Sequence, residues 1–246
     1  MKNFAARQPG LFSLLAIILP MAGMTLARPL LLGYLSELPV RLLAEALFCV
    51  YVAGLVTALG WWREIGMNGP RNWRGLAAYA PWLLLPLLVV AGRGVHPADT
   101  GRVLGYGAFV LMVGFAEEVL LRGVVLRVLQ PGGLMRAVLL SSFFFGAAHL
   151  MNLFAGHEFQ PTLVQVIYAT FLGIGMAGSR LYAGTIVPAI LLHALIDFAD
   201  GVARGFTLAP PKAATLHESA AAIVLTGLYA LYGWWLTRRS RAAGVA

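Results

Sequence analysis

Cysteine and charged residues are both scarce in this sequence, and each shortage excludes a class of protein. The single cysteine, Cys49, excludes an intramolecular disulfide and any cysteine-rich metal site. Charged residues make up only 11 % of the chain, against about 25 % in ordinary soluble domains. With 60 % hydrophobic residues and a mean hydropathy of +0.80, the composition predicts a protein that crosses the membrane several times.

Other features are missing as well. No Gly-rich phosphate loop follows a predicted strand, which leaves nucleotide chemistry without support. No internal repeat stands out, which weighs against transporter folds built from duplicated halves. The first apolar run is too long for a signal-peptide core and has no convincing small-residue cleavage site after it, so we expect it to remain as a transmembrane helix. No stretch of useful size is left over for a water-soluble domain.

Eight apolar runs are present, most of them near the ~20 residues that a bilayer requires. We therefore predict an all-α fold class, a polytopic membrane helical bundle with about eight transmembrane helices. Pro20 and Gly23 predict a kink in the first helix, whereas Pro81 and Pro86 make the short third span the weakest. The expected spans are 11–32, 40–62, 76–91, 104–129, 134–154, 162–181, 184–199 and 219–236.

Lysine and arginine are distributed unevenly between the predicted loops, and this indicates an orientation. If both termini are cytoplasmic, eleven basic residues lie in cytoplasmic segments and six in outer segments, with Arg122 inside the membrane. The cytoplasmic set is Lys2, Arg7, Arg63, Arg71, Arg74, Arg127, Arg136, Arg180, Arg238, Arg239 and Arg241. The outer set is Arg28, Arg41, Arg93, Arg102, Arg204 and Lys212. The net charge of +8 therefore fits topology signals and contacts to anionic lipid better than nucleic-acid binding.

Two adjacent carboxylates and an arginine interrupt the fourth apolar run. Ionisable groups at membrane depth are expensive unless they are paired or face a cavity, so they indicate a functional site. Glu118 and Arg122 are four residues apart and can form an ion pair on one face of the helix. Glu117 points about 100° away from Glu118, so the Glu118–Arg122 ion pair does not account for a second glutamate at this depth. We predict a functional site here, with a purely structural ion pair as the alternative.

Further polar side chains lie at a matching depth on the fifth and seventh runs. At a rise of 1.5 Å per residue, the distances from the cytoplasmic ends of the helices are ~15, ~20, ~14 and ~20 Å for Glu117, His149, His193 and Asp197. These depths agree within about one helical turn, so we expect the side chains to converge on one cavity. The four-residue spacing also places His193 and Asp197 on one helix face, where the carboxyl can orient the imidazole or share a ligand with it.

The residue types in this set are typical of hydrolysis. A carboxylate beside an imidazole in a low-dielectric pocket can activate water, and a polar pair across the cavity can stabilise an oxyanion. The set of Glu117, His149, His193 and Asp197 can equally bind Zn²⁺ or another divalent metal, because these are usual ligand types. A metal-dependent and a metal-free mechanism therefore both stay open. The serines at 141–142 lie about two turns before His149 and are interpreted as helix packing, not as nucleophiles.

Three ordered motifs carry a resemblance to a known family. The motifs Glu117-Glu118-x-x-x-Arg122, Phe145-x-x-x-His149 and His193-x-x-x-Asp197 resemble those of the CAAX prenyl protease and bacteriocin-processing (CPBP, or Abi) intramembrane proteases. The resemblance implies an α-helical membrane endopeptidase with a water-filled internal cavity. We expect a catalytic core in residues 104–200, about three N-terminal transmembrane helices in 1–103, and a last transmembrane helix with a basic tail in 201–246.

The resemblance also implies roles for the motif residues. Glu117 and His149 would activate the water, and His193 and Asp197 would stabilise the oxyanion or hold a metal. The last position is usually Asn in the prenyl proteases, so Asp197 departs from the pattern. An ionised Asp cannot donate to an oxyanion, so Asp197 must be protonated, orient His193 or bind a metal. The departure favours bacterial subfamilies as the nearer relatives.

Glu118 and Arg122 complete the expected catalytic set as a pair that shapes the site. Phe145 and Asn152 are further candidates beside the site, and a core aromatic and a helix-packing amide are equally good interpretations of them. No role is assigned to the histidines of the predicted loops, which are His96, His157 and His217.

The predicted function is hydrolysis of a peptide bond in a membrane-associated peptide or protein, and sequence does not decide whether that substrate is prenylated. The expected partners are this substrate and the lipid bilayer, without nucleic acid, and no oligomeric state is predicted. We expect a multi-pass protein of the bacterial inner membrane with both termini cytoplasmic. The alternatives are a non-catalytic immunity or scaffold protein, a proton-coupled transporter, and bis-histidine haem ligation by His149 and His193.

Overall fold

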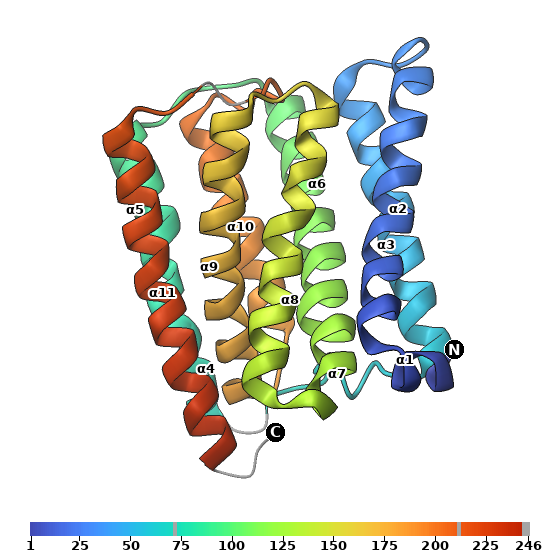
Figure 1. Ribbon diagram of the computed structural model, residues 1–246. Coiled ribbons are helices and arrows are strands. Elements are labelled where there is room, and N and C mark those ends of the chain that lie inside the picture. The colour runs from blue at the N-terminus through green and yellow to red at the C-terminus, as the bar shows by residue number, and fades with distance from the viewer. Residues whose placement is uncertain (71–72, 211–212, 243–246) are drawn as a thin grey trace.

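Eight helical rods run up and down through the molecule, one for each predicted span (Figure 1). The computed structural model describes residues 1–70, 73–210 and 213–242, and no strand occurs among them. The rods are α2 (Pro9–Leu32), α3 (Glu37–Leu59), α4 with η1 and α5 (Trp73–Leu76, Ala77–Leu83, Leu84–Arg93), α6 with η2 and α7 (Thr100–Glu118, Val119–Val125, Leu126–Leu129), α8 with η4 (Leu134–Ala148, His149–Ala155), α9 (Phe159–Ala183), α10 (Val187–Ala203) and α11 (Leu216–Ala242). The predicted all-α membrane bundle is confirmed.

Length and composition make five of the described helices able to cross a membrane. They are Pro9–Leu32, Glu37–Leu59, Leu134–Ala155, Phe159–Ala183 and Leu216–Ala242. The stretch Ala77–Arg93 is apolar but shorter, as the two prolines in the predicted third span led us to expect. The chain is therefore an integral membrane protein.

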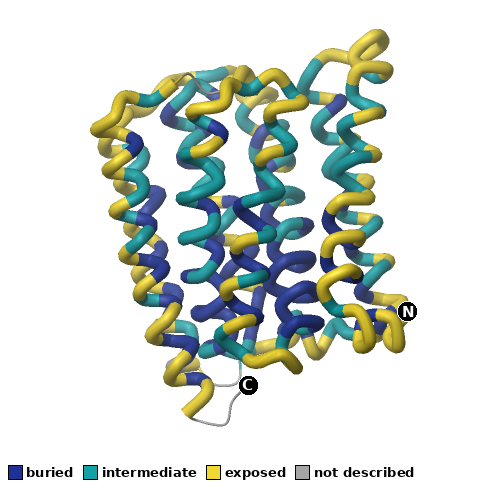
Figure 2. The backbone as a smooth tube through the Cα atoms, viewed as in Figure 1, coloured by how far each residue is buried: buried dark blue, intermediate teal, exposed yellow. Residues whose placement is uncertain are grey.

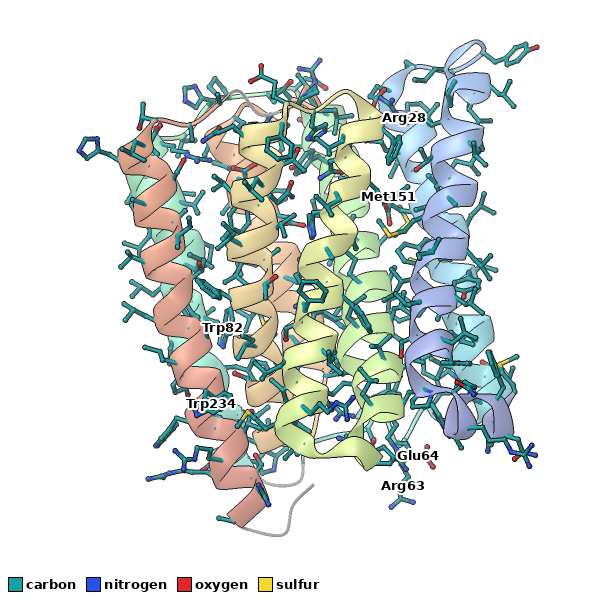
Figure 3. The ribbon with its side chains drawn as sticks, in the orientation of Figure 1. Arg28, Arg63, Glu64, Trp82, Met151 and Trp234 are labelled. Carbon is teal, nitrogen blue, oxygen red and sulfur yellow. The ribbon has the colours of Figure 1, made fainter. Side chains whose placement is uncertain are left out.

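The two ends of the chain lie on the same side of the bundle. The short helix α1 (Lys2–Arg7) and the last turn of α11 are both at the lower end in Figure 1. Figure 3 shows Arg28 at the opposite end from Arg63 and Glu64. This even number of crossings agrees with the predicted topology, whereas the assignment of the lower end to the cytoplasm stays a prediction. Of the basic residues used for it, Arg71, Lys212 and the side chain of Arg74 lie outside the described part of the chain.

Proline and glycine account for the local differences from the predicted spans. In the third rod, α4 gives way to the 3₁₀ stretch η1 around Pro81, because proline cannot donate the backbone hydrogen bond that an α-helix needs. Trp82 then anchors this rod: its Nε1 donates to Ser179 Oγ at 3.1 Å, and its ring packs on Tyr229 (Figure 3). Helix α2 continues unbroken past Pro20. Helix α9 ends at Gly184, whose φ of 74° is left-handed, so α10 begins at Val187 instead of at residue 184.

Burial divides the central rods into two halves. The packed half comprises residues 118–129, 173–183 and 186–194, most of which are buried. The open half comprises residues 100–117, 159–172 and 195–203, most of which remain partly or fully exposed. Figure 2 shows the buried backbone concentrated toward the end that carries the termini. The boundary between the two halves falls between Glu117 and Glu118 on the fourth rod.

Small residues allow the closest helix contacts in the packed half. A Cβ on Gly178 would collide with the backbone of Gly233, and a Cβ on Gly175 would lie 2.6 Å from the ring of Trp82. Helices α9 and α11 therefore approach at the distance that only glycine permits.

The loop after α3 closes the packed half at its end. The carbonyl of Gly66 accepts a hydrogen bond from the backbone N–H of Ile186 at 2.9 Å. Arg180 Nη2 donates to the carbonyl of Glu64 at 2.8 Å, and Tyr79 Oη donates to the carbonyl of Thr185 at 2.9 Å. The first two contacts tie the loop to the start of α10 and to α9, and the third ties η1 to Thr185, just before α10. Helix α10 carries the site residues of the seventh span.

Candidate active site

The two glutamates lie where the fourth rod changes its helical geometry. Helix α6 ends at Glu118, and the next seven residues, Val119–Val125, form the π-helical turn η2. Such turns widen a helix by one residue per turn and occur frequently at functional sites. Neighbouring residues still point about 100° apart on α6, so Glu117 and Glu118 enter different surroundings.

Glu118 is locked into the packed half by two partners. Its Oε1 lies 3.0 Å from Arg122 Nη1 and 2.9 Å from His193 Nδ1. Both side chains of the Glu118–Arg122 pair are only 1 % exposed, so the pair is shielded from water. The guanidinium also lies 3.9 Å from the ring centroid of Phe145, within the range of a cation–π contact. The predicted four-residue ion pair is therefore present, and it belongs to a larger network.

His193 contacts Glu118 with one ring nitrogen and two carboxylates of the open half with the other. Because a carboxylate only accepts, the Nδ1 of His193 donates its proton to Glu118. The opposite nitrogen, Nε2, lies 3.5 Å from Asp197 Oδ2 and 3.7 Å from Glu117 Oε2. The contact with Glu118 thus fixes the ring so that Nε2 faces both carboxylates.

His149 has an equally defined orientation. It lies at the junction of α8 and η4, and its Nδ1 is 2.9 Å from the carbonyl of Phe145. A carbonyl only accepts, so Nδ1 carries the proton and Nε2 keeps its lone pair. No described residue hydrogen-bonds to that Nε2. The nitrogen is therefore available to a water molecule or a substrate.

Phe145 links the two histidines to the arginine. Its ring meets His149 edge to face at a centroid distance of 5.1 Å and His193 at 6.0 Å. The same ring carries the guanidinium of Arg122, as described above. Of the two interpretations offered for Phe145, the structure supports a residue that contacts the site. Asn152 instead donates to Gln165 Oε1 at 2.9 Å, which is the helix-packing interpretation.

Glu117 and Asp197 differ from Glu118 in that they are accessible. Their side chains are 28 % and 36 % exposed, and within the described chain neither carboxylate receives a hydrogen bond from another side chain. Glu117 lies within 4 Å of His193, so these two predicted site residues lie together. His149 joins the group through Phe145. An accessible carboxylate beside a fixed imidazole can accept a proton from water.

The predicted metal ligands do not form a ready-made metal site. Within the described ranges, no group of three His, Cys, Asp or Glu side chains is arranged to hold a metal ion. One ring nitrogen of each histidine is committed to a protein acceptor, and the remaining nitrogens do not join a three-ligand set. The side chains in their described arrangement therefore do not fit a metal ion, and the metal-dependent alternative stays a prediction.

Some residues outside the predicted set also bear on the site. Glu45 on α3 has one buried carboxyl oxygen, Oε2, and the sequence reasoning missed it. The residue lies inside the second apolar run, so the rule applied to Glu117 would have found it. Ser141 and Ser142 are buried between helices, as their interpretation as packing residues expected. Ser142 contacts Gly173 across the α8–α9 interface.

Taken together, these features define a class: a helical membrane protein with a carboxylate–imidazole site between its fourth, fifth and seventh rods. The family model described as type II CAAX prenyl endopeptidase, Rce1-like, matches residues 99–199, which span all three motifs. Residues 99–199, which are less than half of the chain, are therefore similar to the Rce1-like family, and this agrees with the resemblance that the three motifs indicated. Comparisons with curated proteins and with solved structures give no match.

Proposed function

We propose that this chain is an intramembrane endopeptidase in which Glu117 activates the hydrolytic water. The proposal is carried by one observation: Glu117 Oε2 lies 3.7 Å from His193 Nε2, while the adjacent Glu118 holds the other side of the same ring. One glutamate is thus free to exchange a proton and the other keeps the imidazole in place.

In the first step, a water molecule between Glu117 and His149 attacks the carbonyl carbon of the peptide bond. Glu117 Oε2 accepts the proton of the water as the new C–O bond forms, and the Nε2 lone pair of His149 orients the water. The fixed Nδ1–H bond to the carbonyl of Phe145 supports this role, because it holds Nε2 toward the cavity.

In the second step, the charge that develops on the carbonyl oxygen is stabilised by a protonated His193 Nε2. The ring lies among Glu118, Glu117 and Asp197, which supports a proton on each nitrogen. Asp197 then orients His193, one of the three roles expected for an Asp at this position. When the C–N bond breaks, the proton on Glu117 passes to the leaving amine, and the products are a carboxylic acid and an amine.

The test is cleavage by purified protein in detergent and in proteoliposomes. The probe is a fluorescence-quenched peptide that ends in a farnesylated Cys-aliphatic-aliphatic-X sequence, with the unprenylated peptide beside it to decide the substrate class. Wild type is expected to cleave at least one of the two. Glu117→Gln is expected to lower kcat by about 10³-fold, within the range for loss of a general base. Its melting temperature should stay close to that of wild type, because the Glu117 side chain is 28 % exposed and makes no hydrogen bond within the described chain.

Metal analysis and a chelator series on the same preparation separate the two mechanisms. Activity that is unchanged in metal-free protein supports water activation by Glu117 alone, whereas stoichiometric metal with chelator-sensitive cleavage contradicts it. Full activity of Glu117→Gln would rule out the assignment. Ion flux in proteoliposomes without any cleavage would favour the transporter alternative, and cell protection by inactive variants would favour the scaffold alternative.

A further inference from the structure

Helices α6 and α10 approach each other closely at Gly114, one turn before Glu118. Gly114 is buried, and a Cβ on it would lie 2.7 Å from the carbonyl oxygen of Ile190 and 3.2 Å from the backbone nitrogen of Ala194. Ordinary van der Waals contact of a Cβ begins at 3.4 Å. The backbone of α10 therefore occupies the space that a side chain at position 114 would need.

The part of α10 that meets Gly114 is the turn that carries the site imidazole. His193 lies between Ile190 and Ala194, whose backbone atoms face Gly114. Glu118 lies four residues after Gly114 and therefore on the same face of α6. Its Oε1 is 2.9 Å from His193 Nδ1, across the same helix interface. The glycine contact and the carboxylate–imidazole contact are thus one turn apart on one pair of helices.

The contact between Glu118 and His193 tolerates little change in the separation of these helices. Relaxing the 2.7 Å approach at Gly114 to an ordinary 3.4 Å requires a shift of 3.4 − 2.7 = 0.7 Å. Along the line from His193 Nδ1 to Glu118 Oε1, such a shift would lengthen the 2.9 Å contact to about 3.6 Å, which is no longer a hydrogen bond. The ring would then lose the partner that turns its Nε2 toward Glu117.

We infer that Gly114 is a positioning residue, which sets the separation of α6 and α10 at which Glu118 holds the His193 ring. Glu118 and His193 come from different rods, so their contact depends on how closely those rods pack. Gly114 has no side chain that could react, and it acts on the chemistry through the imidazole. The inference deepens the proposed peptidase mechanism and rests on it.

The first test is cleavage of the peptide probe by Gly114→Ala. Its kcat should fall about 10- to 100-fold, because a misplacement of about 1 Å in an active site can cost about 10²-fold. Its KM should stay within about threefold of wild type, because the substitution removes no group that binds the substrate. Ala194→Ser, at another buried position, widens the same interface from α10 by one smaller atom and should give a smaller loss of kcat in the same direction.

Gly107→Ala is the matched control on the same helix. Gly107 lies two turns before Gly114 on α6, where a Cβ would meet only the ring of Phe198 at 3.6 Å, an ordinary contact. Its kcat should stay within about twofold of wild type, and it should melt no lower, because alanine is the better helix former.

Gly178→Ala controls for destabilisation as such. It overpacks α9 against α11, two helices that carry no site residue. Like Gly114→Ala it should lower the melting temperature, because both place a Cβ against the backbone of a neighbouring helix. Only Gly114→Ala should also lose kcat.

The imidazole of His193 provides a readout that does not depend on cleavage. In protein labelled with ¹⁵N-histidine, the Nδ1–H proton of wild type should resonate far downfield, as a hydrogen bond to a carboxylate requires, and His193→Gln assigns this resonance. Gly114→Ala should move the resonance upfield, whereas Gly107→Ala and Gly178→Ala should leave it in place.

These measurements separate the inference from the proposed function. An unchanged resonance in Gly114→Ala would overturn the inference and leave the peptidase function intact, and so would equal losses of kcat in Gly114→Ala and Gly178→Ala. If Gly114→Ala does not fold, Ala194→Ser decides by the same two readouts. If wild type cleaves neither peptide, the proposed function fails, and the resonance still decides on Gly114.

Discussion

The packed half and the open half of the bundle treat the same residue type in opposite ways, and the two adjacent glutamates show the difference. Glu118, at the edge of the packed half, is 1 % exposed and holds both an arginine and a histidine. Glu117, at the edge of the open half, is 28 % exposed and makes no hydrogen bond within the described chain. In the packed half Glu118 thus fixes the His193 imidazole, and in the open half Glu117 keeps an accessible carboxylate beside that ring. Preorganisation and reactivity are divided between neighbouring residues.

The largest expected effect on stability is the loss of the buried arginine. Arg122→Met leaves the buried Glu118 carboxylate without its arginine, with His193 as its remaining partner, and should destabilise the protein by about 3–5 kcal/mol. The measurement is thermal unfolding in detergent. The double variant Glu118→Leu with Arg122→Met should recover most of this loss, because no uncompensated charge remains.

The partly exposed ion pair between Arg28 and Glu37, at the end of the open half, can be compared with the buried Glu118–Arg122 pair. Arg28 and Glu37 are in contact at 2.9 Å, but their side chains are 34 % and 31 % exposed. Glu37→Gln should therefore cost less than about 1 kcal/mol. Equal losses for Glu37→Gln and Arg122→Met would contradict the division into a packed and an open half.

The pairings that depend on spacing within one helix could be predicted from the sequence. Glu118 with Arg122, and His193 with Asp197, follow from i, i+4 geometry, and both contacts are present. The eight rods could also be predicted from the sequence, because each one is a long apolar run. These inferences succeed because a helix fixes its own neighbours.

What could not be predicted depends on contacts between rods. Spacing placed Asp197 beside His193, but it could not show that Glu118 from another rod holds Nδ1 while Asp197 lies at the opposite nitrogen. The place of Phe145 between Arg122 and both histidines also requires the packing of three rods. The π-helical turn leaves no signal in residue type or spacing. Glu45 was predictable in principle, because it is ionisable and lies inside an apolar run.

A smaller effect is expected where helices meet through glycine. Gly178→Ala in the packed half places a Cβ against the backbone of Gly233 and should cost about 1–3 kcal/mol, the range for overpacking. Gly227→Ala on α11 is the control, because its Cβ would meet only the ring of Phe171 at 3.7 Å, an ordinary contact. Melting temperatures of the two variants measure the difference. If both variants melt like wild type, α9 and α11 do not approach as closely as described.

The smallest expected effect lies at the end of the open half, in the loop between η4 and α9. Partial burial lowers the pKa of His157 below its usual 6.5, and the positive charges of Arg41, Arg204 and Arg28 lower it further. Because the folded state binds this proton less readily than the unfolded chain does, the stabilising contribution is complete above pH 6.5. This contribution is lost as the pH falls below 6.5.

Acidification from pH 7.5 to 5.5 should therefore lower the melting temperature of wild type more than that of His157→Asn, by about 1–2 °C. His217→Asn, which removes an exposed imidazole at the same end, should respond to pH as wild type does. A larger loss on acidification in His157→Asn than in wild type would mean that the arginines do not set the potential in this loop, and the open end would then lack the positive charge that its contacts imply.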